Sequence, residues 1–156
     1  MKTKLFSFLS LLCVFCSCSK QTADLDGITT NTIKLSNNNI YITNDALSAT
    51  INTGGDQWAF SYLEVDNNTY PLIYETEGSI ELGLPEGYYV RTDVIDGFFD
   101  GKTPTITEII TDWITINRTL QTISISAKEN KSGMKRIIKI GVQDAGYWEP
   151  ITITQQ

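Results

Sequence analysis

Four short runs near the end of the chain alternate between apolar and polar residues, and this alternation constrains the fold more than any other feature. The apolar members are mostly β-branched, and Asn, Gly and Pro separate the runs. The runs are Ile114/Ile116, Ile123/Ile125/Ala127, Ile138/Ile140/Val142 and Ile151/Ile153. A period of two is typical of half-buried β-strands. Such strands need a second layer to cover their apolar face, so the chain upstream must supply a partner sheet.

The upstream chain continues the same pattern and shows no sustained helical periodicity. Alternating segments predict strands at Thr32–Leu35, Asn39–Thr43, Leu47–Ile51, Gln57–Tyr62, Thr69–Tyr74, Ser79–Leu84, Tyr88–Thr92 and Thr105–Ile110. The Gly54–Gly55 pair indicates a hairpin turn, after which Trp58, Phe60 and Tyr62 are expected on one face. Pro71 restricts its segment to a sheet edge, because proline has no N–H to donate. The predicted fold class is an all-β sandwich.

The first residues have the layout of an export signal. Lys2 and Lys4 precede an apolar run from Leu5 to Phe15, which is too short to span a bilayer as a helix. The sequence Phe15-Cys16-Ser17-Cys18 then resembles the lipobox of bacterial lipoproteins. The resemblance implies a lipoprotein signal peptide at 1–17, lipidation of Cys18 and a flexible tether at 18–32. The alternative is an ordinary cleaved signal peptide followed by a secreted protein.

Residue types exclude several classes of function. All three cysteines lie at or before Cys18 and histidine is absent, so neither a disulfide-stapled scaffold nor a His-dependent triad is expected downstream. Loss of Lys2 and Lys4 takes the net charge from −6 to −8. An acidic domain lacks the electrostatic footprint of a nucleic-acid binder. We expect attachment to a membrane through the lipid, and no cofactor.

Three sequence features resemble BACON domains, which are Ig-like β-sandwich modules of exported proteins from gut bacteria. An alternating strand leads through Gly54–Gly55 to Trp58, and Asp112-Trp113-Ile114-Thr115-Ile116 resembles the second tryptophan strand of that family. The ending Asn130-x-x-Gly133-x-x-Arg136, followed by Ile151-x-Ile153-x-Gln155, is the most specific match. The similarity covers roughly 33–61 and 111–155. It implies one Ig-like β-sandwich domain at 33–156.

The chain departs from the family pattern between its two tryptophan strands. About fifty residues separate Ser61 from Asp112, which is too long for a bare loop. We therefore expect a β-rich insertion at about 61–110. The resemblance implies a lipid-anchored module of the cell envelope, on the periplasmic or the outer face of the outer membrane. We expect it to be non-catalytic and to act as a spacer or protein-interaction component of a surface assembly. The alternative is a carbohydrate-binding module of a glycan-utilisation system.

Aromatic residues at turns are the candidates for ligand binding. Tyr147 and Trp148 follow Asp144-Ala-Gly146 and precede Pro150, which indicates a hairpin tip with a rigid aromatic face beside polar groups. Tyr88 and Tyr89 form a second aromatic pair within the insertion. Trp58 and Trp113 lie in alternating strands, so core packing is expected for them instead. These positions predict a glycan or a surface protein as the partner.

Acidic residues offer two weaker hypotheses. Asp93, Asp96 and Asp100 are a weak candidate for Ca²⁺, although Asp-Gly pairs are also ordinary turns. Glu75, Glu77 and Glu81 could offer a carboxylate pair for glycoside hydrolysis, but their polar, turn-rich surroundings favour a solvated surface. No nucleophile elbow or phosphate loop is present. The sequence therefore predicts a protein that is not an enzyme.

Overall fold

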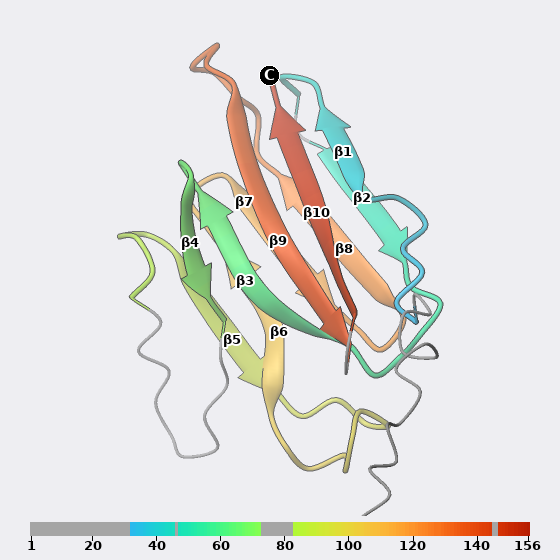
Figure 1. The fold of residues 1–156 in the computed structure, drawn as a ribbon. Coiled ribbons are helices and arrows are strands. Elements are labelled where there is room, and N and C mark those ends of the chain that lie inside the picture. The colour runs from blue at the N-terminus through green and yellow to red at the C-terminus, as the bar shows by residue number, and fades with distance from the viewer. Residues whose placement is uncertain (1–31, 46, 73–82, 145–146) are drawn as a thin grey trace, which may run out of the picture.

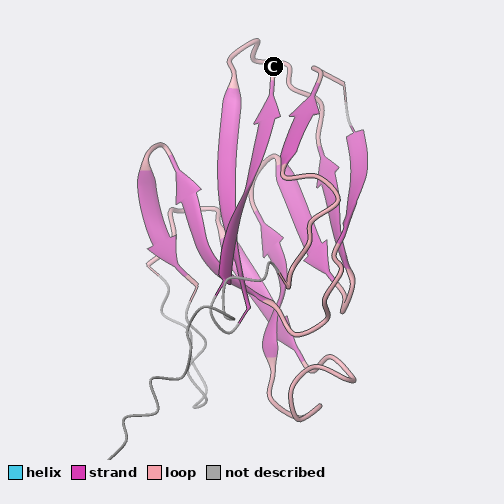
Figure 2. Ribbon diagram, turned by 45° about the vertical axis from the view of Figure 1, so that its right-hand side comes forward, coloured by secondary structure: helices cyan, strands magenta, loops and turns pink. Residues whose placement is uncertain are grey.

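Ten strands form two facing five-stranded sheets (Figure 1). The computed structural model describes residues 32–45, 47–72, 83–144 and 147–156, and these contain no helix (Figure 2). The first sheet has the order β1 (Asn39–Ile42), β10 (Tyr147–Gln155), β9 (Arg136–Asp144), β3 (Ala59–Val65) and β4 (Asn68–Pro71). The second has the order β2 (Leu47–Asn52), β8 (Thr122–Ala127), β7 (Ile114–Arg118), β6 (Thr105–Ile110) and β5 (Tyr89–Asp93). The predicted all-β sandwich is confirmed.

The strand order follows the immunoglobulin-like arrangement. The series β10-β9-β3-β4 corresponds to strands G, F, C and C′, and β2-β8-β7 corresponds to B, E and D. Every pairing is antiparallel except that of β1 with β10. Before β1, the Ser36 N–H donates to the Asn52 carbonyl at the end of β2, so the chain touches the second sheet before joining the first.

Isoleucine fills most of the space between the sheets. The alternating positions of the four closing runs all point inward, as the period of two predicts. Ile116, Ile123, Ile140 and Ile151 have no exposed surface. Trp58 and Trp113 join this core, each just before a strand instead of within it. Two layers of β-branched side chains therefore account for the sandwich.

Two local predictions near the start of the domain are wrong. Residues 32–35 do not form a strand, although Ile33 is buried and its carbonyl accepts from the Gly54 N–H. Gly54–Gly55 does not close a hairpin, because β2 and β3 belong to different sheets. A Cβ at Gly55 would lie 2.5 Å from the Thr32 carbonyl oxygen. The glycine therefore permits close backbone approach where the chain crosses between sheets.

A β-bulge in β3 changes which side chains face the core. Phe60 pairs with Val142, but Tyr62 pairs with Gly141, so Ser61 is the extra residue. Phe60 is buried as predicted, but Tyr62 turns to the outer face and packs where a Cβ of Gly141 would otherwise lie. Leu63 then occupies the inward position. The expectation that Trp58, Phe60 and Tyr62 share one face is therefore wrong for Tyr62.

The segment at 61–110 adds strands to the edges of both sheets. It provides β4 at the edge of the first sheet and β6 and β5 at the edge of the second (Figure 1). Pro71 ends β4 at that edge, as its missing N–H predicts. Of the expected strand at Ser79–Leu84, residues 79–82 lie outside the described residues, and Gly83 and Leu84 are not in a strand.

Candidate functional site

The predicted aromatic tip lies at the β9–β10 connection. Tyr147 pairs with Asp144 across the two-residue link, is half-buried and packs against the core. Trp148 pairs with Gln143 and is 69% exposed. Alternation along β10 directs its side chain away from the core. Trp148 is thus accessible to a ligand, while Tyr147 is mostly structural.

The second predicted pair lies elsewhere on the molecule. Tyr88 is half-buried against the core, and burial, followed by the negative charge of Asp112, raises the pKa of its phenol. Tyr89 is 50% exposed at the start of edge strand β5. Because β5 and β10 belong to different sheets, the structure does not bring this pair together with Tyr147 and Trp148. The four residues do not form one site.

The three aspartates of the Ca²⁺ hypothesis are all exposed. Asp100 accepts hydrogen bonds from the backbone N–H groups of Thr103 and Lys102 and from the Thr103 hydroxyl, and these bonds lower the pKa of its carboxyl group. Asp93 accepts from the N–H of Val94. In the described part of the chain, no group of three or more acids, cysteines or histidines is placed to hold a metal ion. Glu75, Glu77 and Glu81 lie outside the described residues.

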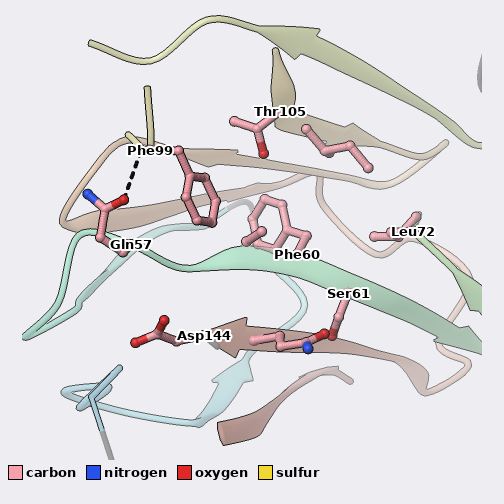
Figure 3. A pocket seen from close by; sticks show the side chains of 10 residues that line it. Gln57, Phe60, Ser61, Leu72, Phe99, Thr105 and Asp144 are labelled. Carbon is pink, nitrogen blue, oxygen red and sulfur yellow. Dashed lines mark hydrogen bonds between the residues drawn. The ribbon is translucent and has the colours of Figure 1, made fainter. Parts of the chain in front are cut away.

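The loop at 94–104 is fastened to the start of β3 by one glutamine. The Gln57 amide donates to the Gly97 carbonyl at 2.8 Å. It also accepts from the Phe99 N–H at 2.8 Å (Figure 3). Phe99 has φ = 47°, a left-handed conformation that is unfavourable for an aromatic residue. Its side chain is 71% exposed. Residues in such sparsely populated backbone conformations cluster at functional sites, so this loop is a candidate for one.

A buried arginine supports the same loop from inside. The Arg118 guanidinium lies between the Trp58 and Phe98 rings, with its carbon 4.1 Å and 4.5 Å from their centroids. Its Nη1 donates to the Thr105 hydroxyl, whereas Nε and Nη2 have no hydrogen-bond partner. Burial lowers the pKa of Arg118 to about 10, which leaves it charged at neutral pH. This stack joins β7, the start of β3 and the loop.

A groove of about 360 Å³ opens beside this assembly, along the first half of β3 (Figure 3). Phe60, Leu72, Phe99 and Ile106 supply its apolar surface. Its polar lining consists of Gln57, Ser61, Thr105, Gln143 and Asp144. The Ser61 hydroxyl is buried without a hydrogen-bond partner. An apolar wall with a few polar groups is the usual composition of a small binding site, and we define these residues as the β3 groove.

Sequence reasoning did not identify the β3 groove. Its residues come from β3, the 94–104 loop, β6 and β9, together with Gln57 before β3 and Leu72 after β4, and only the folded topology brings these together. One signal was present, because Pro71 predicts that its segment lies at a sheet edge. The aromatic pair Phe98–Phe99 within an Asp-Gly-rich loop was a second signal. The sequence alone could not show that one ring is buried and the other displayed.

Comparisons with known proteins give one structural match. No protein-family model and no curated protein matches the chain. An NMR structure of a protein from Bacteroides thetaiotaomicron is similar, with a TM-score of 0.47 and 9% sequence identity over 81% of this chain and 80% of that chain. Among the described residues, none forms a helix long and apolar enough to cross a membrane.

Proposed function

We propose that this protein is a lipid-anchored, non-catalytic module of the bacterial cell envelope that binds a protein partner within a surface assembly. Cys18 and the lipobox-like residues before it support the anchor, and the BACON-like motifs support a place among exported modules. The expectation of a role without catalysis comes from the sequence, which has no histidine and no nucleophile elbow. In this proposal the domain binds a partner while its lipid holds it at the membrane.

One observation on the outer face of the first sheet carries the protein-binding part. Tyr41 of β1 and Ile137 of β9 both pair with Thr154 of β10, so the three side chains form a row across neighbouring strands. Tyr41 is 76% exposed and Ile137 is 43% exposed. Large apolar side chains displayed on a flat sheet face are typical of protein interfaces.

Two experiments test the proposal. Replacing Cys18 with Ala should abolish labelling by a lipid precursor and release the domain from the membrane fraction; unchanged lipidation would rule out Cys18 as the anchor. A photoactivatable residue at Tyr41 should then crosslink one specific envelope protein in cells. The matched control is Ser124, which is exposed on the opposite sheet. Equal crosslinking from Tyr41 and Ser124 would argue against a specific interface on the first sheet.

Carbohydrate binding is the second candidate function, because Trp148 presents an exposed indole beside the polar side chain of Gln143. Aromatic faces and hydrogen-bonding side chains together suit a sugar ring. Calorimetry of the wild type and of Trp148→Ala against host and dietary polysaccharides tests this candidate. Binding that is lost with Trp148 supports it, and no binding by the wild type rejects it.

A further inference from the structure

Lysine and arginine are concentrated in one stretch of this acidic chain. Ten Lys and Arg residues follow Cys18, and five of these ten lie between positions 128 and 139 with a single acid, Glu129. The other five cations share the rest of the chain with 17 acids. The basic stretch covers the β8–β9 loop and the start of β9. Its five cations are Lys128, Lys131, Lys135, Arg136 and Lys139.

Buried polar side chains hold the β8–β9 loop in one shape, at the end of the sandwich where β10 finishes (Figure 1). The Asn130 amide donates to the Met134 carbonyl at 2.7 Å and accepts from the Ser132 hydroxyl at 2.7 Å. Gln155, which has no exposed surface, donates to the Lys128 carbonyl at 2.7 Å. A loop that is already ordered loses little conformational entropy when it binds a partner.

The ordered loop displays an apolar side chain between cations. Met134 is 71% exposed, and the exposed Ile137 of β9 follows it closely in the chain. Lys135 is exposed between them, and no ion pair to it is found among the described residues. Lys131 pairs with Glu129 at 3.3 Å, but both side chains are more than half exposed, so this pair is weak. Both lysines are therefore available to an anionic partner.

A hollow of about 260 Å³ beside Lys135 limits where the acids of a partner can lie. Glu64 and Lys139 line it and neutralise each other through an ion pair at 2.6 Å. Asp66 also lines the hollow and would repel an acidic group placed there. The acidic groups of a partner are therefore expected over the β8–β9 loop and not in the hollow.

We infer that the protein partner docks an acidic segment with one apolar residue at its centre over the β8–β9 loop. The apolar side chain contacts Met134 and Ile137, and the flanking carboxylates lie beside Lys131 and Lys135. Opposite charge speeds the encounter and fixes its orientation, while the apolar contact supplies much of the affinity. Methionine suits such a contact because its unbranched side chain adapts to the surface that it meets. The inference rests on the proposed protein-binding function and names the chemistry of the partner.

The position of the exposed side chains favours a protein over a bilayer as the occupant. Met134 lies on the loop at the end of the sandwich, whereas Ile137 and Tyr41 lie on the outer face of the first sheet. A flat bilayer that touched the end would leave the sheet face uncovered. Anionic headgroups would also repel the rest of this acidic domain. A folded protein can cover both surfaces.

The probe is a set of synthetic nine-residue peptides with four Glu residues around a central Leu, Ile, Phe or Trp, and Ser elsewhere. Matched peptides replace every Glu with Gln, or the central residue with Ser. At least one Glu peptide should bind the full-length wild type at low salt, and its binding should weaken about tenfold with either replacement. Added salt should weaken it as well. Nuclear magnetic resonance should place the shifted amides at 131–137.

Variants at exposed positions locate the site without disturbing the core. The double variant Lys131→Gln/Lys135→Gln and the single variant Met134→Ser should each weaken peptide binding about tenfold with unchanged melting. Lys102→Gln, which neutralises an exposed lysine of another loop, is the matched control and should bind normally.

Several results would overturn the inference: no peptide binds, the Gln peptides bind as well as the Glu peptides, or both loop variants bind normally. It is also overturned if anionic phosphatidylglycerol vesicles shift the 131–137 amides and the peptides do not. A specific Tyr41 crosslink in cells without peptide binding would count against this inference alone. Peptide binding without a Tyr41 crosslink would instead count against the proposed function.

Discussion

The guanidinium of Arg118 stacks on the indole of Trp58, with its carbon 4.1 Å from the ring centroid. Only 5% of Arg118 is exposed, and no ion pair to it is found in the described part of the chain. The Phe98 ring also contacts this guanidinium, with its centroid 4.5 Å from the same carbon. A charged group that contacts two aromatic rings thus closes this end of the inter-sheet core. Isoleucine fills the other layers of the core.

Replacing Arg118 with Met should leave the free energy of unfolding unchanged or raise it by about 1–2 kcal/mol. Methionine keeps much of the volume, while the cost of burying an unpaired charge disappears. Arg118→Ala should instead lower stability by about 2–4 kcal/mol, because a cavity forms between the rings. Chemical denaturation of both variants at pH 7 measures the contrast. If Met is as damaging as Ala, the charge itself stabilises the fold.

The same residue predicts a dependence on alkaline pH. Burial lowers the pKa of Arg118 to about 10 in the folded state, well below the usual value of an arginine side chain. Between these values the unfolded chain binds more protons than the native chain, so raising the pH relieves the cost of the buried charge. The stability of the wild type relative to Arg118→Met should therefore rise as the pH is raised above about 10. A constant difference over this alkaline range would contradict the lowered pKa.

Trp58→Ala should lower the free energy of unfolding by about 3–5 kcal/mol, which is the usual cost of truncating a buried aromatic side chain. The ring is 1% exposed, and its indole N–H donates to the Leu120 carbonyl at 2.9 Å and to the Thr53 hydroxyl at 3.1 Å. Trp58→Phe keeps part of the volume and loses both bonds, so we expect a smaller loss. Unchanged melting of the Ala variant would place Trp58 outside the core.

Gly141→Ala should be destabilising by about 1–3 kcal/mol, because the added Cβ would collide with the ring of Tyr62. The double variant Gly141→Ala/Tyr62→Ala removes the collision, so the two effects should be strongly non-additive. Denaturation of both single variants and the double variant completes the cycle. Additive losses would show that Tyr62 does not lie over Gly141.

Gln57→Ala should loosen the 94–104 loop with little effect on the global transition. The substitution removes the bonds to the Gly97 carbonyl and the Phe99 N–H, while the sheets keep their own hydrogen bonds. Hydrogen exchange at Phe99 should accelerate. Gln121→Ala, an exposed glutamine in another turn, is the matched control. Equal exchange in the two variants would mean that Phe98 and Arg118 alone hold the loop.

The sequence predicts the sandwich well because β-branched residues with a period of two have few other ways to be buried. It also predicts the edge position of Pro71 and the burial of Trp58 and Trp113. The outward direction of the Tyr62 side chain could not be predicted. The extra residue at Ser61 reverses which face of the sheet each later side chain of β3 points to. The false hairpin at Gly54–Gly55 has a similar cause, since a tight turn does not reveal whether the next strand stays in the same sheet.

The candidate site was less predictable from the sequence than the fold. Trp148 is exposed near the start of β10. Tyr88 and Tyr89 lie at the start of β5 in the other sheet, away from Trp148. The β3 groove depends on where β4 stops relative to β3 and on which of Phe98 and Phe99 points inward. Both are decided by tertiary contacts, including the glutamine bonds of Gln57 and the buried stack of Arg118, which local pattern does not encode.

The parallel pairing of β1 with β10 places the entry of the described chain and its last strand residue at opposite poles of the domain. The chain enters beside Gly54 and Gly55 at one pole, and β10 finishes at the opposite pole after nine residues, roughly 30 Å away (Figure 1). The Gln57–Phe99 end of the β3 groove lies at the entry pole. The Tyr41 row lies toward the other pole, where β10 ends. Ligands of the groove and partners of the Tyr41 row would therefore meet the domain at opposite ends.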